Sequence, residues 1–182
     1  TAGWGGRMLA AMSLGINYTG YDTNINMKSA YKSMMCMDED NIYSVNCWDA
    51  NCVNDYCLYN NGTSVEMYWK NCLEGYFTND SFDLVLTSPP YGNMELYEHM
   101  SPWKNDDEYF TDFLVPLMNK LFQETNCPVC INVSPRIYHK LTSSISNYGI
   151  RACDEEIDLR QQLGKQYKTK SQDLIYVWHP TQ

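Results

Sequence analysis

Apolar runs of strand length alternate along this chain with longer segments in which apolar residues recur at helical spacing. Helices are predicted over 7–14, with Gly15 as a stop, over 25–35, and over 110–122, where Pro116 predicts a kink or a helix start. Strands are predicted over 17–22, 65–69, 82–86, 129–133 and 173–178, with 150–159 as a more polar candidate. Residues 36–64 are rich in Cys, Asn and Asp without a clear period and are interpreted as an irregular insertion.

This alternation predicts an α/β fold in a single domain over 1–182, with a mostly parallel, doubly wound sheet. In such sheets ligands bind at the carboxyl ends of the strands. Polar residues that directly follow a strand are therefore the first candidates for chemistry.

Composition and charge exclude several classes of protein. The 182 residues carry 13 Lys and Arg against 22 Asp and Glu, a net charge of -9, which argues against a stand-alone, tight nucleic-acid binder. The sequence has no apolar run of about 18 residues and no charged and then apolar leader, so we expect a cytoplasmic protein that is not secreted and has no membrane span. The eight cysteines lack regular spacing and are expected to be reduced thiols.

The most informative segment is a hydrophobic strand that ends in two prolines and an aromatic residue, Thr87-Ser88-Pro89-Pro90-Tyr91. Adjacent prolines fix φ and restrict the residue before each of them, so Ser88 and Pro89 are held extended. The Ser88 hydroxyl and the Pro89 carbonyl can both accept hydrogen bonds from a planar amine while the Tyr91 ring stacks on it. For an isolated Pro-Pro pair, the alternative is a rigid turn without a ligand.

This segment resembles motif IV, (Ser/Thr/Asp/Asn)-Pro-Pro-(Tyr/Phe), of the S-adenosylmethionine-dependent methyltransferases that modify exocyclic amino groups of nucleobases. The start of the chain, Ala2-Gly3-Trp4-Gly5-Gly6-Arg7, resembles their motif I, and Asp22 at the end of the next strand resembles motif II. The combination looks most like the short phage- or virus-type DNA amino-methyltransferases. The resemblance implies a Rossmann-like methyltransferase fold with a C-terminal antiparallel hairpin, and S-adenosylmethionine as cofactor.

The resemblance also implies roles for the matching residues. The glycine turn passes close to the methionine end of the cofactor, Asp22 takes the ribose hydroxyls, and Asn71 stands near the adenine, where relatives often have an acid. The cofactor-binding residues are then Ala2, Gly3, Trp4, Gly5, Gly6, Asp22, Asn71 and Thr87, and the catalytic residues are Ser88, Pro89, Pro90 and Tyr91.

In this family the motif IV side chain and the next proline carbonyl accept the two amino hydrogens of a flipped base. Ser88 resembles the cytosine-N4 enzymes more than the adenine-N6 enzymes, so the expected reaction is methyl transfer to cytosine N4 in DNA, ahead of adenine N6. Cytosine carbon-5 methyltransferases use a nucleophilic cysteine in a Pro-Cys dipeptide. No cysteine here follows a proline, which excludes a resemblance to those enzymes. An RNA base amino-methyltransferase and a non-catalytic methyltransferase-like scaffold subunit are the alternatives.

Local positive charge offers a candidate DNA contact within an acidic chain. Residues 159–172, between the last two strands, carry four basic residues and no acid. The candidate phosphate contacts are Arg136, Arg160, Lys165, Lys168 and Lys170, with His139 and Lys140 as additions. An ordinary solvated hairpin is the alternative.

Further residues complete the sequence-based picture. Glu95 and Tyr97 are candidates for shaping the target pocket, with a solvent-facing loop as the alternative. No metal is expected, because the gaps between Cys36, Cys47, Cys52 and Cys57 lack the Cys-x-x-Cys spacing of a zinc site. The sequence has no strand before Gly3 and no segment large enough for a target-recognition domain. We therefore expect a fragment, or a first strand from residues outside it, with specificity supplied by loops, a fused domain or a partner.

Overall fold

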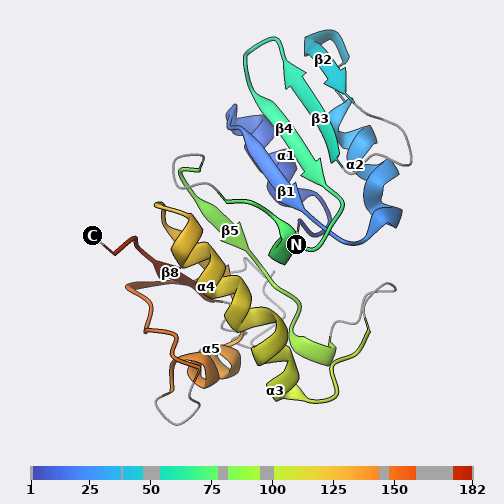
Figure 1. Ribbon diagram of the computed structural model, residues 1–182. Coiled ribbons are helices and arrows are strands. Elements are labelled where there is room, and N and C mark those ends of the chain that lie inside the picture. Colours follow the sequence, from blue (N-terminus) through green and yellow to red (C-terminus); the bar gives the residue numbers. More distant parts are fainter. Residues whose placement is uncertain are drawn as a thin grey trace, which may run out of the picture. The chain divides into compact units, whose positions relative to one another are not determined.

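The computed structural model is an α/β protein with two mixed sheets (Figure 1). It describes residues 2–37, 39–46, 54–77, 82–94, 101–143, 148–158 and 174–181. The described residues fall into two compact units, which meet in sequence between Gly75 and Tyr76. We call them the amino-terminal unit and the carboxy-terminal unit.

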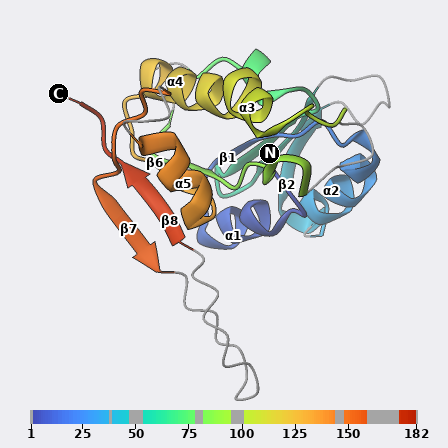
Figure 2. The same cartoon turned by 90° about the horizontal axis from the view of Figure 1, so that it is seen from below.

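The amino-terminal unit is a four-stranded sheet with helices on one face. Its elements are α1 (Gly6–Leu14), β1 (Tyr18–Tyr21), the 3-10 turn η1 (Ile25–Met27), α2 (Lys28–Met35), the 3-10 turn η2 (Glu39–Asn41), β2 (Ile42–Asn46), β3 (Asn54–Tyr59), β4 (Ser64–Tyr68) and the 3-10 turn η3 (Cys72–Glu74). The strand order is β1-β4-β3-β2, in which β1 and β4 are parallel and the other pairs are antiparallel. Seen from below, α1 and α2 lie on the same side of this sheet (Figure 2).

Buried and half-buried residues alternate along β3 and β4, and the buried ones lie on the sheet face that the helices cover. Val65 and Met67 of β4 are fully buried, whereas Ser64, Glu66 and Tyr68 are half-buried. Gly20 of β1 lies beside Met67, and a Cβ there would collide with the Met67 sulfur. The helices add their own apolar residues to this side of the sheet, and the buried members of the core include Met8, Tyr31, Met35, Cys57, Tyr59 and Trp69.

The interpretation of residues 36–64 as an irregular insertion was wrong for its described part, since β2 and β3 lie within it. β3 alternates between half-buried and buried positions in the way a strand on a core does. One of its inward positions is Asp55, which is 1% exposed and accepts a 2.7 Å hydrogen bond from the Trp69 indole. Lys28 of α2 stands 3.5 Å from the same carboxylate. Because Asp55 is polar and faces the core, the apolar residues of β3 do not alternate regularly, and the pattern of apolar residues alone does not predict this strand.

The carboxy-terminal unit is a second four-stranded sheet, and its strand order is β5-β6-β8-β7. Its elements are β5 (Val85–Thr87), the 3-10 turn η4 (Gly92–Met94), α3 (Asp106–Tyr109), the π-helical turn η5 (Phe110–Leu114), α4 (Val115–Glu124), β6 (Val129–Asn132), α5 (Pro135–Thr142), β7 (Glu155–Asp158) and β8 (Leu174–Trp178). α4 lies over one face of the sheet and α5 over the other (Figures 1 and 2). β6 is accordingly buried at three consecutive positions, as expected for a strand covered on both faces.

The predicted irregularity near Pro116 is confirmed. Pro116 lies in the first turn of α4, and the turn directly before it is π-helical. Proline lacks the N–H that would bond to the carbonyl four residues back and crowds that carbonyl, and one wider turn accommodates both effects. The apolar face survives the change, since Phe110, Leu114, Leu117 and Leu121 are all buried.

The predicted helices and strands agree with the structure in kind, and several strands are shorter than expected. The strand after Pro128 pairs antiparallel with β8, and β7 pairs antiparallel with β8, so the predicted C-terminal antiparallel hairpin is confirmed. The expectation of a mostly parallel sheet does not hold for the described strands, because only β1–β4 and β5–β6 are parallel pairs. In the amino-terminal unit, β2 and β3 add two antiparallel pairs, β2–β3 and β3–β4, to the one parallel pair.

Candidate functional site

The proline corner follows the carboxyl end of β5. Thr87, Pro89 and Pro90 are buried, while Ser88 and Tyr91 are half-buried. Gly92 then turns the chain with φ +59° beside the ring of Tyr109. The two prolines therefore anchor the corner in the unit, and the two residues that carry hydroxyl groups retain access to its surface.

Asn132 is a site residue that the sequence-based prediction missed. It ends β6, the parallel neighbour of β5, and the register pairs Thr87 with Ile131 just before the corner. The Tyr91 hydroxyl donates to Asn132 Oδ1 at 3.0 Å, and Ser88 Oγ lies 3.5 Å from the same oxygen. A polar residue at the carboxyl end of the strand predicted over 129–133 was the available signal.

The glycine turn precedes α1 in the amino-terminal unit. Gly3 and Gly5 have φ values of +73° and +90°, a region that favours glycine. A Cβ on Gly5 would collide with the end of the Met34 side chain, 2.7 Å from its sulfur, whereas a Cβ on Gly6 would meet nothing within 4 Å. Gly5 is the N-cap of α1 and supplies no side-chain cap. The open space beside Gly6 and the amide donors of the first turn of α1 fit a ligand carboxylate.

Asp22 holds this turn at the end of β1. Its two carboxylate oxygens accept from the Gly3 amide at 3.1 Å and from the Asn24 amide at 2.9 Å. The Tyr31 hydroxyl donates to the Gly3 carbonyl at 2.9 Å, and the Ala2 amide donates to the Tyr21 carbonyl at 2.8 Å. An ionised carboxylate has about four acceptor positions, so Asp22 can close the turn and still accept from a ligand hydroxyl.

The other cofactor candidates of the amino-terminal unit have different surroundings. Ala2 is buried and Trp4 is 79% exposed. Asn71 caps η3, because its Oδ1 accepts from the Leu73 amide at 3.0 Å. The role of Asn71 near adenine stays a prediction, and its carbonyl oxygen already has this local partner.

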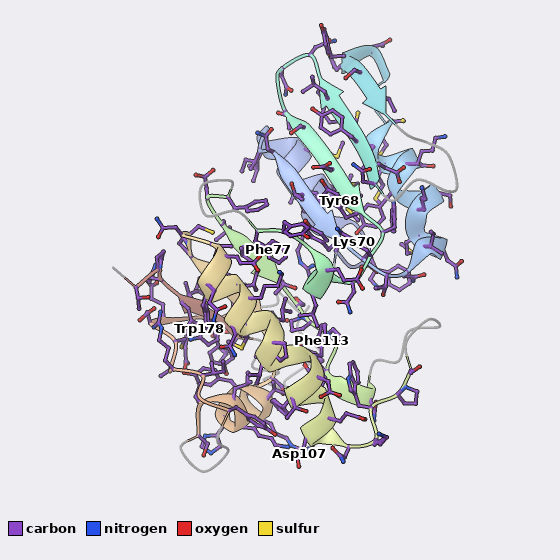
Figure 3. The ribbon with its side chains drawn as sticks, in the orientation of Figure 1. Tyr68, Lys70, Phe77, Asp107, Phe113 and Trp178 are labelled. Carbon is purple, nitrogen blue, oxygen red and sulfur yellow. The ribbon has the colours of Figure 1, made fainter. Side chains whose placement is uncertain are left out.

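An aromatic pair lies on the sheet face opposite α1 and α2. The rings of Tyr21 and Tyr68 stack with centroids 5.0 Å apart, and Lys70 Nζ lies 5.3 Å from the Tyr68 ring (Figure 3). Burial, together with the hydrogen bond to Glu66, raises the pKa of Tyr68 to about 12. Tyr68 therefore stays protonated at neutral pH and keeps its bond to that carboxylate.

The described candidates for phosphate contact are already paired with acids. Arg136 Nη2 stands 3.6 Å from Asp106, and Lys140 Nζ stands 3.1 Å from Asp107. The Lys140 and Tyr148 side chains lower the pKa of Asp107. Exposed pairs of this kind are weak and exchange readily, so a phosphate could replace Asp106 at Arg136, which is 87% exposed. His139 is exposed on the same helix. Arg160, Lys165, Lys168 and Lys170, like Glu95 and Tyr97, lie outside the described residues.

Cysteines and metal ligands add no second site to the part of the chain that the structure describes. Six cysteines are described, Cys36, Cys57, Cys72, Cys127, Cys130 and Cys153, and all are free thiols. Cys47 and Cys52 lie outside the described residues. Within the described ranges no three His, Cys, Asp or Glu side chains come together as metal ligands, and no helix has the length and apolar character needed to cross a bilayer.

A cavity of about 260 Å³ lies at the opposite end of β6 from Asn132. Phe122, Val129 and Trp178 form part of its wall. It therefore does not coincide with the proline corner.

Comparison with known proteins found no matching family model, no matching curated protein and no matching solved structure.

Proposed function

We propose that this protein transfers a methyl group from S-adenosylmethionine to the exocyclic amino group of a flipped base in DNA, with cytosine N4 favoured over adenine N6. The observation that carries the proposal is the group of acceptors at the carboxyl ends of β5 and β6. The Ser88 hydroxyl, the Pro89 carbonyl and the Tyr91 ring come from one rigid corner. The carboxyl edge of a parallel pair is where α/β sheets bind their ligands.

The chemistry explains why such a corner is sufficient. The amine of a base is a poor nucleophile because its lone pair is delocalised into the ring. Ser88 Oγ and the Pro89 carbonyl can accept its two N–H groups and favour a pyramidal nitrogen, and the Tyr91 ring can hold the base by stacking. No covalent nucleophile from the chain is required. The residues act by positioning and by electrostatic stabilisation of the developing positive charge on nitrogen.

The amino-terminal unit fits the cofactor that this chemistry needs. S-adenosylmethionine, when bound, would supply the electrophilic methyl group and leave as S-adenosylhomocysteine, and the methylated nitrogen would release one proton to solvent. Gly5 packs closely against Met34, the space beside Gly6 is open, and the uncapped first turn of α1 offers amide donors to a carboxylate. Asp22 stands at the carboxyl end of β1 and retains acceptor positions for ribose hydroxyls.

The strand pairs support a Rossmann-like arrangement as part of the proposal. Parallel strands of a doubly wound sheet follow the order 3-2-1-4-5. If β1 and β4 are strands 2 and 3, and β5 and β6 are strands 4 and 5, both observed parallel pairs match this order. In this order strand 1 lies beside strand 2, the place that β1 takes here. The Ala2 amide bonds to Tyr21 on the edge of β1 that β4 does not occupy, because the next residue, Asp22, bonds to Tyr68 of β4.

Digestion and mass spectrometry of nucleosides provide the direct test. DNA and RNA are each incubated with the full-length protein and S-adenosylmethionine, and then hydrolysed. N4-methylcytosine in DNA is the expected product, and N6-methyladenine would shift the base preference. Methylated bases in RNA alone would support the RNA enzyme instead. A protein that binds no S-adenosylmethionine by calorimetry and methylates neither polymer would be a scaffold, contrary to the proposal.

Variants separate the two parts of the site. Ser88→Ala and Tyr91→Ala are each expected to lower methyl transfer tenfold or more with little change in cofactor affinity, because both side chains act on the base. Asp22→Ala is expected to weaken cofactor binding. Asp40 and Tyr43 are exposed, so Asp40→Ala and Tyr43→Ala are matched controls expected to change neither quantity. Equal loss of cofactor affinity in the Ser88 and Tyr91 variants would contradict the assignment of these residues to the base.

A further inference from the structure

Asn132 directs its carbonyl oxygen at the proline corner. Tyr91 donates its hydroxyl hydrogen to Asn132 Oδ1 at 3.0 Å, and Ser88 Oγ lies 3.5 Å from that atom. The two hydroxyls come from the same corner and converge on one oxygen from the neighbouring strand. Asn132 is itself half-buried, so its side chain is held within the unit and is not a mobile surface group.

A second contact fixes which way the amide of Asn132 faces. Its Nδ2 donates to the Leu174 carbonyl of β8 at 2.8 Å. A backbone carbonyl only accepts, so the opposite orientation would place two oxygens against each other. The amide therefore has one favourable orientation, in which the nitrogen faces β8 and the oxygen faces Ser88 and Tyr91.

The direction of these hydrogen bonds has a chemical consequence. An amide oxygen only accepts, so a hydroxyl that bonds to it must donate its hydrogen and keeps its lone pairs for other partners. The two N–H groups of a base amine need acceptors. An aspartate or asparagine at position 88 would offer an acceptor oxygen unaided, whereas a serine hydroxyl must be oriented to do so.

We propose that Asn132 is the positioning residue of this site: it orients the Ser88 hydroxyl as an acceptor for the base amine and pins the Tyr91 ring. The assignment rests on the proposed function. Asn132 acts through Ser88 and Tyr91 and has no contact with the reacting atoms itself. The other contact of its side chain, to β8, supplies the competing explanation that Asn132 only supports the sheet.

Two substitutions of similar size distinguish these explanations. Asn132→Leu removes every polar contact. Asn132→Asp keeps an acceptor toward the corner but sets its second oxygen against the Leu174 carbonyl, so it perturbs the contact with β8 at least as much as Leu does. For a positioning residue, methyl transfer by the Leu variant falls about tenfold, the loss expected for one good hydrogen bond, and the Asp variant stays within about threefold of the wild type. If Asn132 only supports β8, the Asp variant loses as much as the Leu variant, which overturns the proposal.

A cycle of variants separates the loss of transfer that passes through Ser88 and Tyr91 from a loss that passes through β8. In a Ser88→Ala, Tyr91→Phe background, Asn132→Leu is expected to lower transfer less than threefold further, because the groups through which it acts are gone. Losses that multiply in full would overturn the proposal. Asn119 is exposed on α4, and Asn119→Leu is the matched control with unchanged transfer.

Two further measurements keep the outcomes distinct. Circular dichroism melting verifies that each variant is folded, and calorimetry is expected to give an unchanged affinity for S-adenosylmethionine. A wild-type protein that methylates no base overturns the proposed function and this role with it. An active wild type whose Asn132→Leu variant is equally active overturns the role alone.

Discussion

Replacement of Gly5 by alanine tests the geometry of the glycine turn. Gly5 has φ +90°, and alanine in the left-handed region costs about 1–2 kcal/mol. The new Cβ would also collide with the end of the Met34 side chain, which is half-buried against the core. That side chain is flexible, so it can move to a poorer rotamer at a cost of about 0.5–1.5 kcal/mol. Together the two effects predict a loss of about 1.5–3.5 kcal/mol in the free energy of unfolding.

The neighbouring glycine provides the control. Gly6 is the first residue of α1, and a Cβ there would meet nothing within 4 Å. Gly6→Ala should therefore be neutral or stabilise the chain by up to about 1 kcal/mol, because alanine favours the helix. Both variants remove one glycine from the unfolded chain, so the difference between them reports the folded turn.

Urea titrations followed by circular dichroism measure this difference, and thermal melting provides a second reading. For a chain of this size a loss of 2 kcal/mol corresponds to a melting temperature lower by about 4–8 °C. A Gly5→Ala protein as stable as Gly6→Ala would refute the reasoning, because Gly5 could not then have its left-handed conformation beside Met34.

Two further predictions concern charged groups outside the turn. Asp55→Ala should lower the free energy of unfolding in urea by about 3–5 kcal/mol, because it removes the buried carboxylate that Lys28 and the Trp69 indole contact. The exposed control Asp40→Ala should change that free energy by less than about 0.5 kcal/mol, and equal effects of the two substitutions would show that Asp55 is not buried. The Arg151 guanidinium lowers the pKa of Asp154 in the folded protein below 3.8, the ordinary value for aspartate. The stability that this carboxylate adds is therefore fully present above pH 3.8 and is lost as the pH falls through the folded-state pKa. Asp154→Asn should therefore be less stable than the wild type at pH 7 and converge with it in acid, whereas a difference that persists in acid would refute the linkage.

Local patterns were sufficient to predict most of the elements. The glycine after Leu14 adopts φ +66° and ends α1, and the proline at 116 lies in the first turn of α4, which follows the π-helical turn. Both residues restrict the backbone through their own covalent structure, so their effect is visible in the sequence. The same holds for the proline corner, whose stiffness comes from Pro89 and Pro90 themselves.

Position 55 is one case in which the local pattern failed, and α5, which was not predicted, is another. An aspartate in a segment rich in Asn and Cys predicts a loop, yet Asp55 lies in a strand and faces the core of the amino-terminal unit. Burial of this carboxylate depends on Lys28 from α2 and Trp69 from beyond β4, and both partners are distant in sequence. Such pairing is a property of the folded chain, and no spacing along the sequence indicates it.

The sequence by itself determined the chemical character of the two candidate segments: a turn that needs glycine because its φ values are positive, and a corner that is stiff because two prolines restrict rotation. The tertiary structure alone decided how each segment is held. It brought Asp22 and Tyr31 to the glycine turn and Asn132 to Ser88 and Tyr91. The physical reason is that conformational limits belong to single residues, whereas the direction of a hydrogen bond depends on two groups that only folding brings within reach.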